Sequence, residues 1–253
     1  MIFAAGLGTR LKPLTDTMPK ALVPLAGKTL LQWQIEQLKA AGITDIVVNV
    51  HHFADMIIDY LRENDNFGCR ISVSDERNTP LETGGGLRKA KPLLTQTTSA
   101  QQTHPTSEPI LACNVDILSN INLPALLEAY NPNEMGLVVV SKRDTQRYLL
   151  FDESNRLFGW THIGTGEVRP SSLIRNSKLQ ALAFSGMQVL NPRIFDCMDE
   201  LAEKKGEKFS LIDLYIHIAE KEILRAYIPE NYRMMDVGKI TQLSEAEDFA
   251  NSL

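Results

Sequence analysis

The spacing of apolar residues alternates between two periods through the first half of the chain. Short apolar runs predict buried strands at residues 2–4, 46–50, 71–74 and 110–113. Apolar residues at helical spacing predict helices between them at residues 31–41, 53–61 and 86–94. This alternation predicts an α/β fold with a doubly wound, mostly parallel sheet, whose ligands bind at the carboxyl ends of the strands.

The pattern changes after another apolar strand at residues 137–140. Residues 147–151 and 157–160 predict two antiparallel strands around a turn, and a longer strand follows at residues 182–190. Further elements are expected as helices at residues 192–203 and 210–221, a strand at 224–228 and a last helix from residue 241. We expect one domain over residues 1–253, with a small antiparallel insertion in its second half. Residues 95–108 are polar and irregular, which indicates a surface excursion.

Composition narrows the class of protein. The chain has 253 residues, of which 43% are hydrophobic and 23% charged, as in a globular protein with a sizeable core. Its net charge of −5 argues against general binding to nucleic acid or to an anionic membrane, and no apolar run approaches the length of a membrane span. Cys69, Cys113 and Cys197 are odd in number and far apart, so we expect reduced thiols and a cytoplasmic location.

The loop after the first predicted strand is the most specific feature. Residues 6–10 read Gly-Leu-Gly-Thr-Arg, and Lys20 follows ten residues after Arg10. Glycines let backbone N–H groups approach a phosphate closely, and the two cations add the charge that a polyphosphate requires. The spacing excludes the dinucleotide fingerprint, whose third glycine would replace Leu11, and no ATPase loop sequence occurs. The loop predicts a nucleoside triphosphate as substrate; Gly6-Leu7-Gly8 alone would fit an ordinary turn.

Other segments at predicted strand ends carry polar groups. Glu-Thr-Gly-Gly-Gly at residues 82–86 precedes a predicted helix, so a base or sugar can pack against backbone whose N–H groups are free to donate; the alternative is a flexible turn. We expect nucleotide contacts from Glu82, Thr83, Gly84 and Gly85. Asp116 and Asp236 each end an apolar strand, and two such carboxylates can hold Mg²⁺, although a lone aspartate there is more often a turn residue.

Residues 6–20, Asn114-Val115-Asp116 and Asp236-Val237-Gly238 together resemble the signature of the sugar-1-phosphate nucleotidyltransferases. The segments 82–86 and 184–186 are similar to those of the N-acetylmuramate-1-phosphate uridylyltransferases of cell-wall recycling, and mannose-1-phosphate guanylyltransferases are the second resemblance. The resemblance implies a Rossmann-like, glycosyltransferase-A-like fold. It also implies a nucleotide-binding half at residues 1–120 and a sugar-phosphate-binding half at 121–253.

The same resemblance implies the reaction and its residues. A sugar 1-phosphate attacks the α-phosphorus of a nucleoside triphosphate, and pyrophosphate leaves. Arg10 holds the pyrophosphate, Lys20 neutralises the α-phosphoryl group, and Asp116 and Asp236 hold Mg²⁺. The triphosphate is bound by the backbone of Ala5, Gly6, Gly8 and Thr9, and the sugar pocket is lined by Phe184, Ser185 and Gly186.

Two departures from the family pattern leave alternatives open. Val115 replaces the usual glycine before the metal aspartate, and the Glu-Lys-Pro motif is missing, so Arg147 or Arg143 is expected to take over from its lysine. UTP with N-acetylmuramate 1-phosphate is our first choice of substrates. GTP with mannose 1-phosphate, or a catalytically inactive nucleotide-binding regulatory subunit, is the alternative. We expect no nucleic acid or membrane partner, and the sequence leaves monomer and homodimer open.

Overall fold

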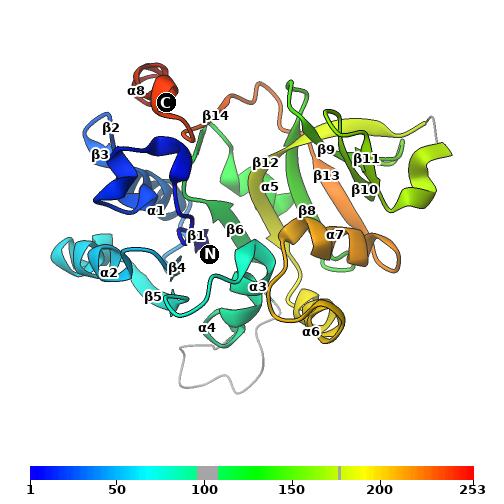
Figure 1. The fold of residues 1–253 in the computed structure, drawn as a ribbon, viewed down its shortest axis with the longest axis horizontal. Helices are drawn as coiled ribbons and strands as arrows, with labels where there is room; N and C mark the ends of the chain where they lie inside the picture. Colours follow the sequence, from blue (N-terminus) through cyan, green and yellow to red (C-terminus); the bar gives the residue numbers. More distant parts are fainter. Residues whose placement is uncertain (96–107, 176–177) are drawn as a thin grey trace. The chain divides into compact units, whose positions relative to one another are not determined.

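The computed structural model describes residues 1–95, 108–175 and 178–253 (Figure 1). By its internal contacts the chain forms two compact units. The first unit comprises Met1–Pro80, Cys113–Pro124 and Tyr232–Leu253. The second unit comprises Leu81–Ala112 and Ala125–Asn231. Most of the segment that we expected as a surface excursion, residues 96–107, lies outside the described residues.

The first unit is built on parallel strands. Strand β1 lies between β4 and β6, and β4 also pairs with β5. The bounds are Ile2–Phe3 (β1), Asp45–Val50 (β4), Arg70–Asp75 (β5) and Ile110–Asn114 (β6), of which Cys113 and Asn114 belong to the first unit. Ile2 is fully buried and lies opposite Val48 on one side and Cys113 on the other. All four strands confirm the prediction from apolar runs, and β1 leads directly into the glycine loop.

The helices of the first unit also lie where the apolar spacing predicts them. Their bounds are Leu30–Ala40 (α1), Ala54–Glu63 (α2) and Leu243–Asn251 (α8). Helix α1 begins where the Thr29 hydroxyl accepts a hydrogen bond from the Gln32 N–H, and it stops before Gly42, whose φ of 81° suits a residue without Cβ. A short helix, α5 (Leu123–Glu128), spans the boundary between the units.

Two small antiparallel pairs complete the first unit. One is a hairpin of β2 (Pro24–Leu25) and β3 (Lys28–Thr29). The other pairs β7 (Ile117–Ser119) with β14 (Met234–Asp236), so that Asp236 lies opposite Ile117. We call this second pair the β7–β14 ribbon. It joins chain segments that are far apart in sequence.

The second unit is mostly antiparallel. Strands follow the order β11-β10-β9-β12, β8 runs antiparallel to β12, and β13 runs parallel to β8. The bounds are Gly136–Ser141 (β8), Arg147–Phe151 (β9), Leu157–His162 (β10), Glu167–Arg169 (β11), Gln180–Leu190 (β12) and Leu224–Tyr227 (β13). These strands confirm the antiparallel insertion expected in the second half of the chain.

The helices of the second unit are Glu82–Lys89 (α3), Lys91–Thr95 (α4), Ile194–Lys205 (α6) and Leu211–Ala219 (α7). Helix α7 begins with a capping box in which Ser210 and Asp213 each accept from the other's backbone N–H. Helix α3 begins four residues earlier than predicted. The prediction excluded most of the glycine run from the helix because glycine is a poor helix former. Among the described residues, no helix is long and apolar enough to cross a membrane.

Candidate active site

The glycine loop folds into three successive 3₁₀ turns, Thr9–Leu11, Leu14–Asp16 and Lys20–Leu22. Gly8 has a φ of 65°, and its carbonyl accepts hydrogen bonds from the Leu11 N–H (2.8 Å) and the Thr15 hydroxyl (2.9 Å). A Cβ on Gly8 would lie 2.8 Å from Thr15 Cγ2 and 3.0 Å from Lys20 Cβ. Gly8 is therefore required both for its backbone conformation and for the close approach of Lys20.

Two consecutive hydrogen bonds between buried polar groups fix the backbone at the point where β1 enters this loop. Asn49 Oδ1 accepts from the Ala4 N–H (2.7 Å), and Asn49 Nδ2 donates to Glu76 Oε1 (2.7 Å). Asn49 and Glu76 are only 2% and 1% exposed. Sequence reasoning missed both residues, although an asparagine inside the apolar run of β4 was a signal, since a buried polar side chain needs a partner.

Lys20 and Asp116 form the central contact of the site. Lys20 Nζ donates to Asp116 Oδ2, and only 9% of the lysine side chain is exposed. The Asp116 carbonyl accepts from the Val237 N–H (2.8 Å), which ties the aspartate to the end of β14. A lysine so deeply buried requires a counter-charge, and Asp116 supplies it.

Arg10 and Asp236 meet beside Gly238. A Cβ on Gly238 would lie 2.6 Å from Asp236 Oδ1 and 2.8 Å from Arg10 Nη2, so the ends of both side chains lie close to this glycine. The register of the β7–β14 ribbon places Asp236 opposite Ile117, the residue after Asp116. The first unit therefore brings together both predicted cations and both predicted carboxylates. The described residues contain no cluster of three or more His, Cys, Asp or Glu side chains that could enclose a metal.

The glycine run of residues 84–86 differs from our expectation. It lies inside α3, and the N–H groups of Gly84 and Gly85, which we expected to be free, both donate to the Phe209 carbonyl at 3.0 Å. A Cβ on Gly84 would lie 2.6 Å from the Phe209 ring and 2.8 Å from the Ser210 carbonyl oxygen. These glycines allow α3 to pack against the start of α7, which sequence spacing alone does not reveal.

Glu82 and Thr83 lie at the first turn of α3. Glu82 is exposed and has a φ of 62°, whereas the Thr83 hydroxyl accepts from the Leu211 N–H at 3.0 Å. Of the polar groups predicted in this segment, the Glu82 carboxylate is therefore the one that faces solvent.

The predicted sugar-binding segment lies on β12, where the pairing with β8 shifts register between Phe184 and Gln188. Gly186 sits in this bulge with a φ of 73°, and Ser185 is fully buried, its hydroxyl 3.4 Å from that of Ser141. Arg143 Nη2 donates to the Phe184 carbonyl (2.9 Å).

The two arginines proposed in place of the missing lysine differ in their surroundings. Arg147 begins β9 and pairs with His162 across β10, whereas Arg143 is bonded directly to the Phe184 segment. Of the two arginines, Arg143 is therefore the one whose hydrogen bond to the Phe184 segment is seen in the structure.

Comparison with known proteins agrees with this geometry. A family model for nucleotidyl transferases matches residues 1–252. The N-acetylmuramate alpha-1-phosphate uridylyltransferase of Caulobacter vibrioides is 31% identical over 245 residues, covering 92% of this chain and 89% of the relative. A mannose-1-phosphate guanyltransferase of Yarrowia lipolytica is 29% identical over 242 residues, covering 94% of this chain but 60% of the relative.

Among solved structures, a UDP-glucose pyrophosphorylase complexed with UDP-glucose superposes with a TM-score of 0.74 at 19% identity, covering 99% of this chain and 97% of the other. That likeness shows a shared fold. The chain belongs to the nucleotidyl transferase family. It is an enzyme of the sugar-1-phosphate nucleotidyltransferase class, as the resemblance of its motifs implied.

Proposed function

We propose that the enzyme transfers a uridylyl group from UTP to N-acetylmuramate 1-phosphate, with release of pyrophosphate. The observation that carries the chemistry is the first-unit cluster of Arg10, Lys20, Asp116 and Asp236 beside the glycine loop. Support for the substrate pair comes from the uridylyltransferase that is 31% identical over nearly the whole of both chains. GTP with mannose 1-phosphate is the second candidate, supported by the 29% identical guanyltransferase.

The proposed reaction is an in-line displacement. An oxygen of the sugar phosphate forms a bond to the α-phosphorus, and the bond from that phosphorus to the bridging oxygen of pyrophosphate breaks. The attacking phosphate is already ionised at neutral pH, so no protein base is needed. Catalysis then depends on positioning and on neutralising charge. Lys20 would neutralise the α-phosphoryl oxygens, and Arg10 would hold the departing pyrophosphate.

Mg²⁺ is part of the proposal. Mg²⁺ is usually bound by one or two carboxylates together with substrate phosphates and water, so the two aspartates are a suitable donor set even without a third ligand. Asp116 and Asp236 would hold the ion, which supplies Lewis-acid neutralisation of phosphate charge when bound. The Asp116 carboxylate also forms the ion pair with Lys20.

The proposal also includes a cytoplasmic location and a role in the supply of cell-wall sugar nucleotides. All three cysteines are free thiols, as a reducing compartment requires. Monomer and homodimer both remain compatible with it.

A pyrophosphate-release assay over the four common nucleoside triphosphates tests the substrate choice. Each triphosphate is paired with N-acetylmuramate 1-phosphate and with mannose 1-phosphate, in MgCl₂ and in EDTA. We expect the highest kcat/KM with UTP and N-acetylmuramate 1-phosphate, and no turnover in EDTA. Turnover only with GTP and mannose 1-phosphate would replace our first choice by the second candidate, and full turnover in EDTA would remove Mg²⁺ from the proposal.

A further inference from the structure

Strand β7 has two edges, and only one of them is paired with another strand. On the paired edge, the Asp116 carbonyl accepts a hydrogen bond from the Val237 N–H, and the Asn120 N–H donates to the Arg233 carbonyl. Since backbone groups of alternate residues point to opposite edges, the carbonyls of Ile117 and Ser119 face away from β14. The β7–β14 ribbon is a two-stranded sheet, so no further strand covers this edge among the described residues.

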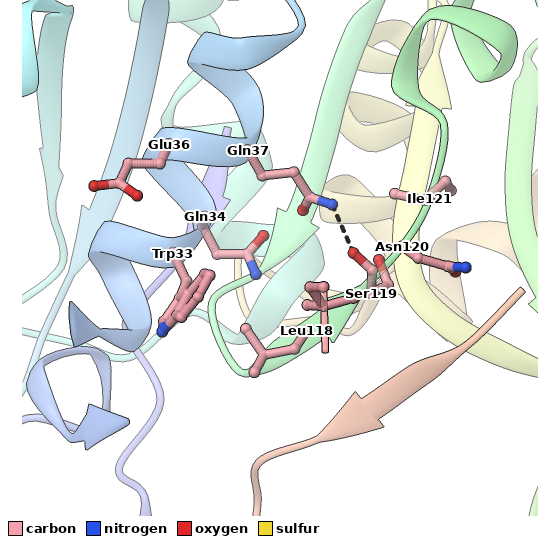
Figure 2. Close-up of a pocket in the computed structure, with 9 residues that line it drawn as sticks. Trp33, Gln34, Glu36, Gln37, Leu118, Ser119, Asn120 and Ile121 are labelled. Carbon is pink, nitrogen blue, oxygen red and sulfur yellow. Dashed lines mark hydrogen bonds between the residues drawn. The ribbon is translucent and has the colours of Figure 1, made fainter. Parts of the chain in front are cut away.

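Two glutamine side chains of α1 cover that edge instead. Gln34 Nε2 donates to the Ile117 carbonyl. Gln37 Nε2 donates to the Ser119 carbonyl at 2.9 Å, the bond that Figure 2 marks with a dashed line. The spacing of the two donors on α1 matches that of the two acceptors on β7. Residues three apart, such as Gln34 and Gln37, share a face of a helix, and the backbone carbonyls of residues two apart share an edge of a strand. Ile117, Leu118 and Ser119 are each less than a tenth exposed, so these carbonyls are largely shielded from bulk water.

The residues held in this way are next to the proposed catalytic carboxylates. Ile117 directly follows Asp116 and lies opposite Asp236 in the ribbon. Asp116 in turn holds Lys20. A shift of β7 relative to α1 would therefore move Asp116, and through the ribbon Asp236, away from the lysine and the glycine loop.

We propose that Gln34 and Gln37 are positioning residues for the catalytic carboxylates. Their amides take the place of a neighbouring strand, and they fix the β7–β14 ribbon against α1. This inference rests on the proposed roles of Asp116 and Asp236 in the reaction.

The two glutamines differ in their surroundings, which predicts an order of effects. Both glutamines line a cavity of about 360 Å³, but Gln34 is only 1% exposed and its acceptor Ile117 is not part of the cavity wall. Gln37 and Ser119 both line that cavity, where water can replace a lost amide (Figure 2). Loss of Gln34 should therefore disturb the ribbon more than loss of Gln37.

The test uses Gln34→Met and Gln37→Met, which keep the length of the side chain and remove the donor. Gln32→Met is the matched control, because Gln32 lies on the same helix but bonds Glu36 and Tyr60 instead of β7. Steady-state kcat and the Mg²⁺ concentration for half-maximal rate are measured with the substrate pair that the wild type turns over fastest. Asp116→Asn is included in the same assay.

For Gln34→Met we expect kcat to fall about 10-fold and the half-maximal Mg²⁺ concentration to rise by a similar factor, as for loss of an outer partner of a metal ligand. Gln37→Met should show the same two changes to a smaller extent. If Gln34→Met does not fold, Gln37→Met tests the positioning role by itself. Gln32→Met should keep both wild-type values even if its Tm falls.

Wild-type kcat and Mg²⁺ dependence in both test variants, in an assay where Asp116→Asn is inactive, would overturn the inference and leave the proposed function intact. An equal effect in Gln32→Met would overturn it too, since the change would then be a general loss of helix stability. Full activity of Asp116→Asn would instead refute the proposed role of the carboxylate, and with it the premise of the inference.

Discussion

At the residue scale, the pairing of Lys20 with Asp116 stabilises the buried cation to which we assign phosphate binding. Only 9% of the Lys20 side chain is exposed, and a charge so far from water is costly unless it is paired. Asp116 provides the pair, while Thr15 and Gly8 hold the backbone of the loop close to Lys20. In the proposed reaction this pairing would preorganise the cation, which is the condition for electrostatic catalysis.

This arrangement predicts a large kinetic effect for Lys20→Gln. Loss of one preorganised charge should lower kcat by a factor on the order of 10²–10³. Pyrophosphate release measures the change. Lys12→Gln in the same loop is the control, since Lys12 forms an exposed pair with Asp16 at 2.9 Å and should keep nearly the wild-type rate. A Lys20→Gln rate as high as that of the control would refute the role of Lys20.

At the element scale, helix α3 shows how a glycine run can serve packing. Gly84 and Gly85 let the backbone of α3 approach residues 207–210 so closely that both N–H groups bond the Phe209 carbonyl. Exposed Gly→Ala changes in helices usually stabilise, because alanine is the better helix former. Here the added methyl group meets the Phe209 ring and the Ser210 carbonyl.

We therefore predict that Gly84→Ala lowers the free energy of unfolding by about 1–3 kcal/mol, the usual cost of overpacking. Urea unfolding followed by circular dichroism measures it. A stability equal to or above that of the wild type would show that α3 does not need the close approach.

The start of helix α7 predicts a pH dependence. Burial alone would raise the pKa of Asp213, but hydrogen bonds from Lys205 and Ser210 outweigh burial and hold the pKa below its usual value. The unfolded chain then takes up this proton first, so the stabilisation is present above about pH 4 and is lost as the pH falls further. The wild type should lose stability below pH 4 more steeply than Asp213→Asn in urea unfolding at stepped pH. Identical pH profiles would contradict this.

At the scale of the whole molecule, the two units carry different parts of the proposed chemistry. The first unit holds the glycine loop, both cations and both aspartates. The second unit holds α3 and the Phe184 segment with Arg143. Substitutions in the two units should therefore affect different kinetic constants.

For Arg143→Ala we predict a KM for the sugar 1-phosphate that rises about 10-fold or more, as expected for loss of a charge-assisted hydrogen bond, with the KM for the nucleoside triphosphate unchanged. Arg147→Ala is the matched comparison in initial-rate measurements. A larger effect of Arg147→Ala would return the role to that residue.

Much of the fold could be predicted from the sequence, because local patterns specify it. The apolar runs located β4, β5, β6 and β8, and the glycine loop indicated a phosphate ligand. The features that were missed depend on partners far away in the chain. These features are the Asn49–Glu76 pair, the packing of Gly84 on Phe209, and the contacts of Gln34 and Gln37 with β7. They join residues that are 27 to 125 positions apart. No spacing rule within one segment reports such contacts.

The measurement that tests the central claim most directly is product formation by the wild type and by Asp116→Asn. With UTP, N-acetylmuramate 1-phosphate and Mg²⁺, the wild type should form UDP-sugar and pyrophosphate in equal amounts. Asp116→Asn should retain its fold by circular dichroism and lose at least about 10²-fold in kcat. No transfer by the wild type with any triphosphate and sugar 1-phosphate, or equal rates for the two proteins, would contradict this account.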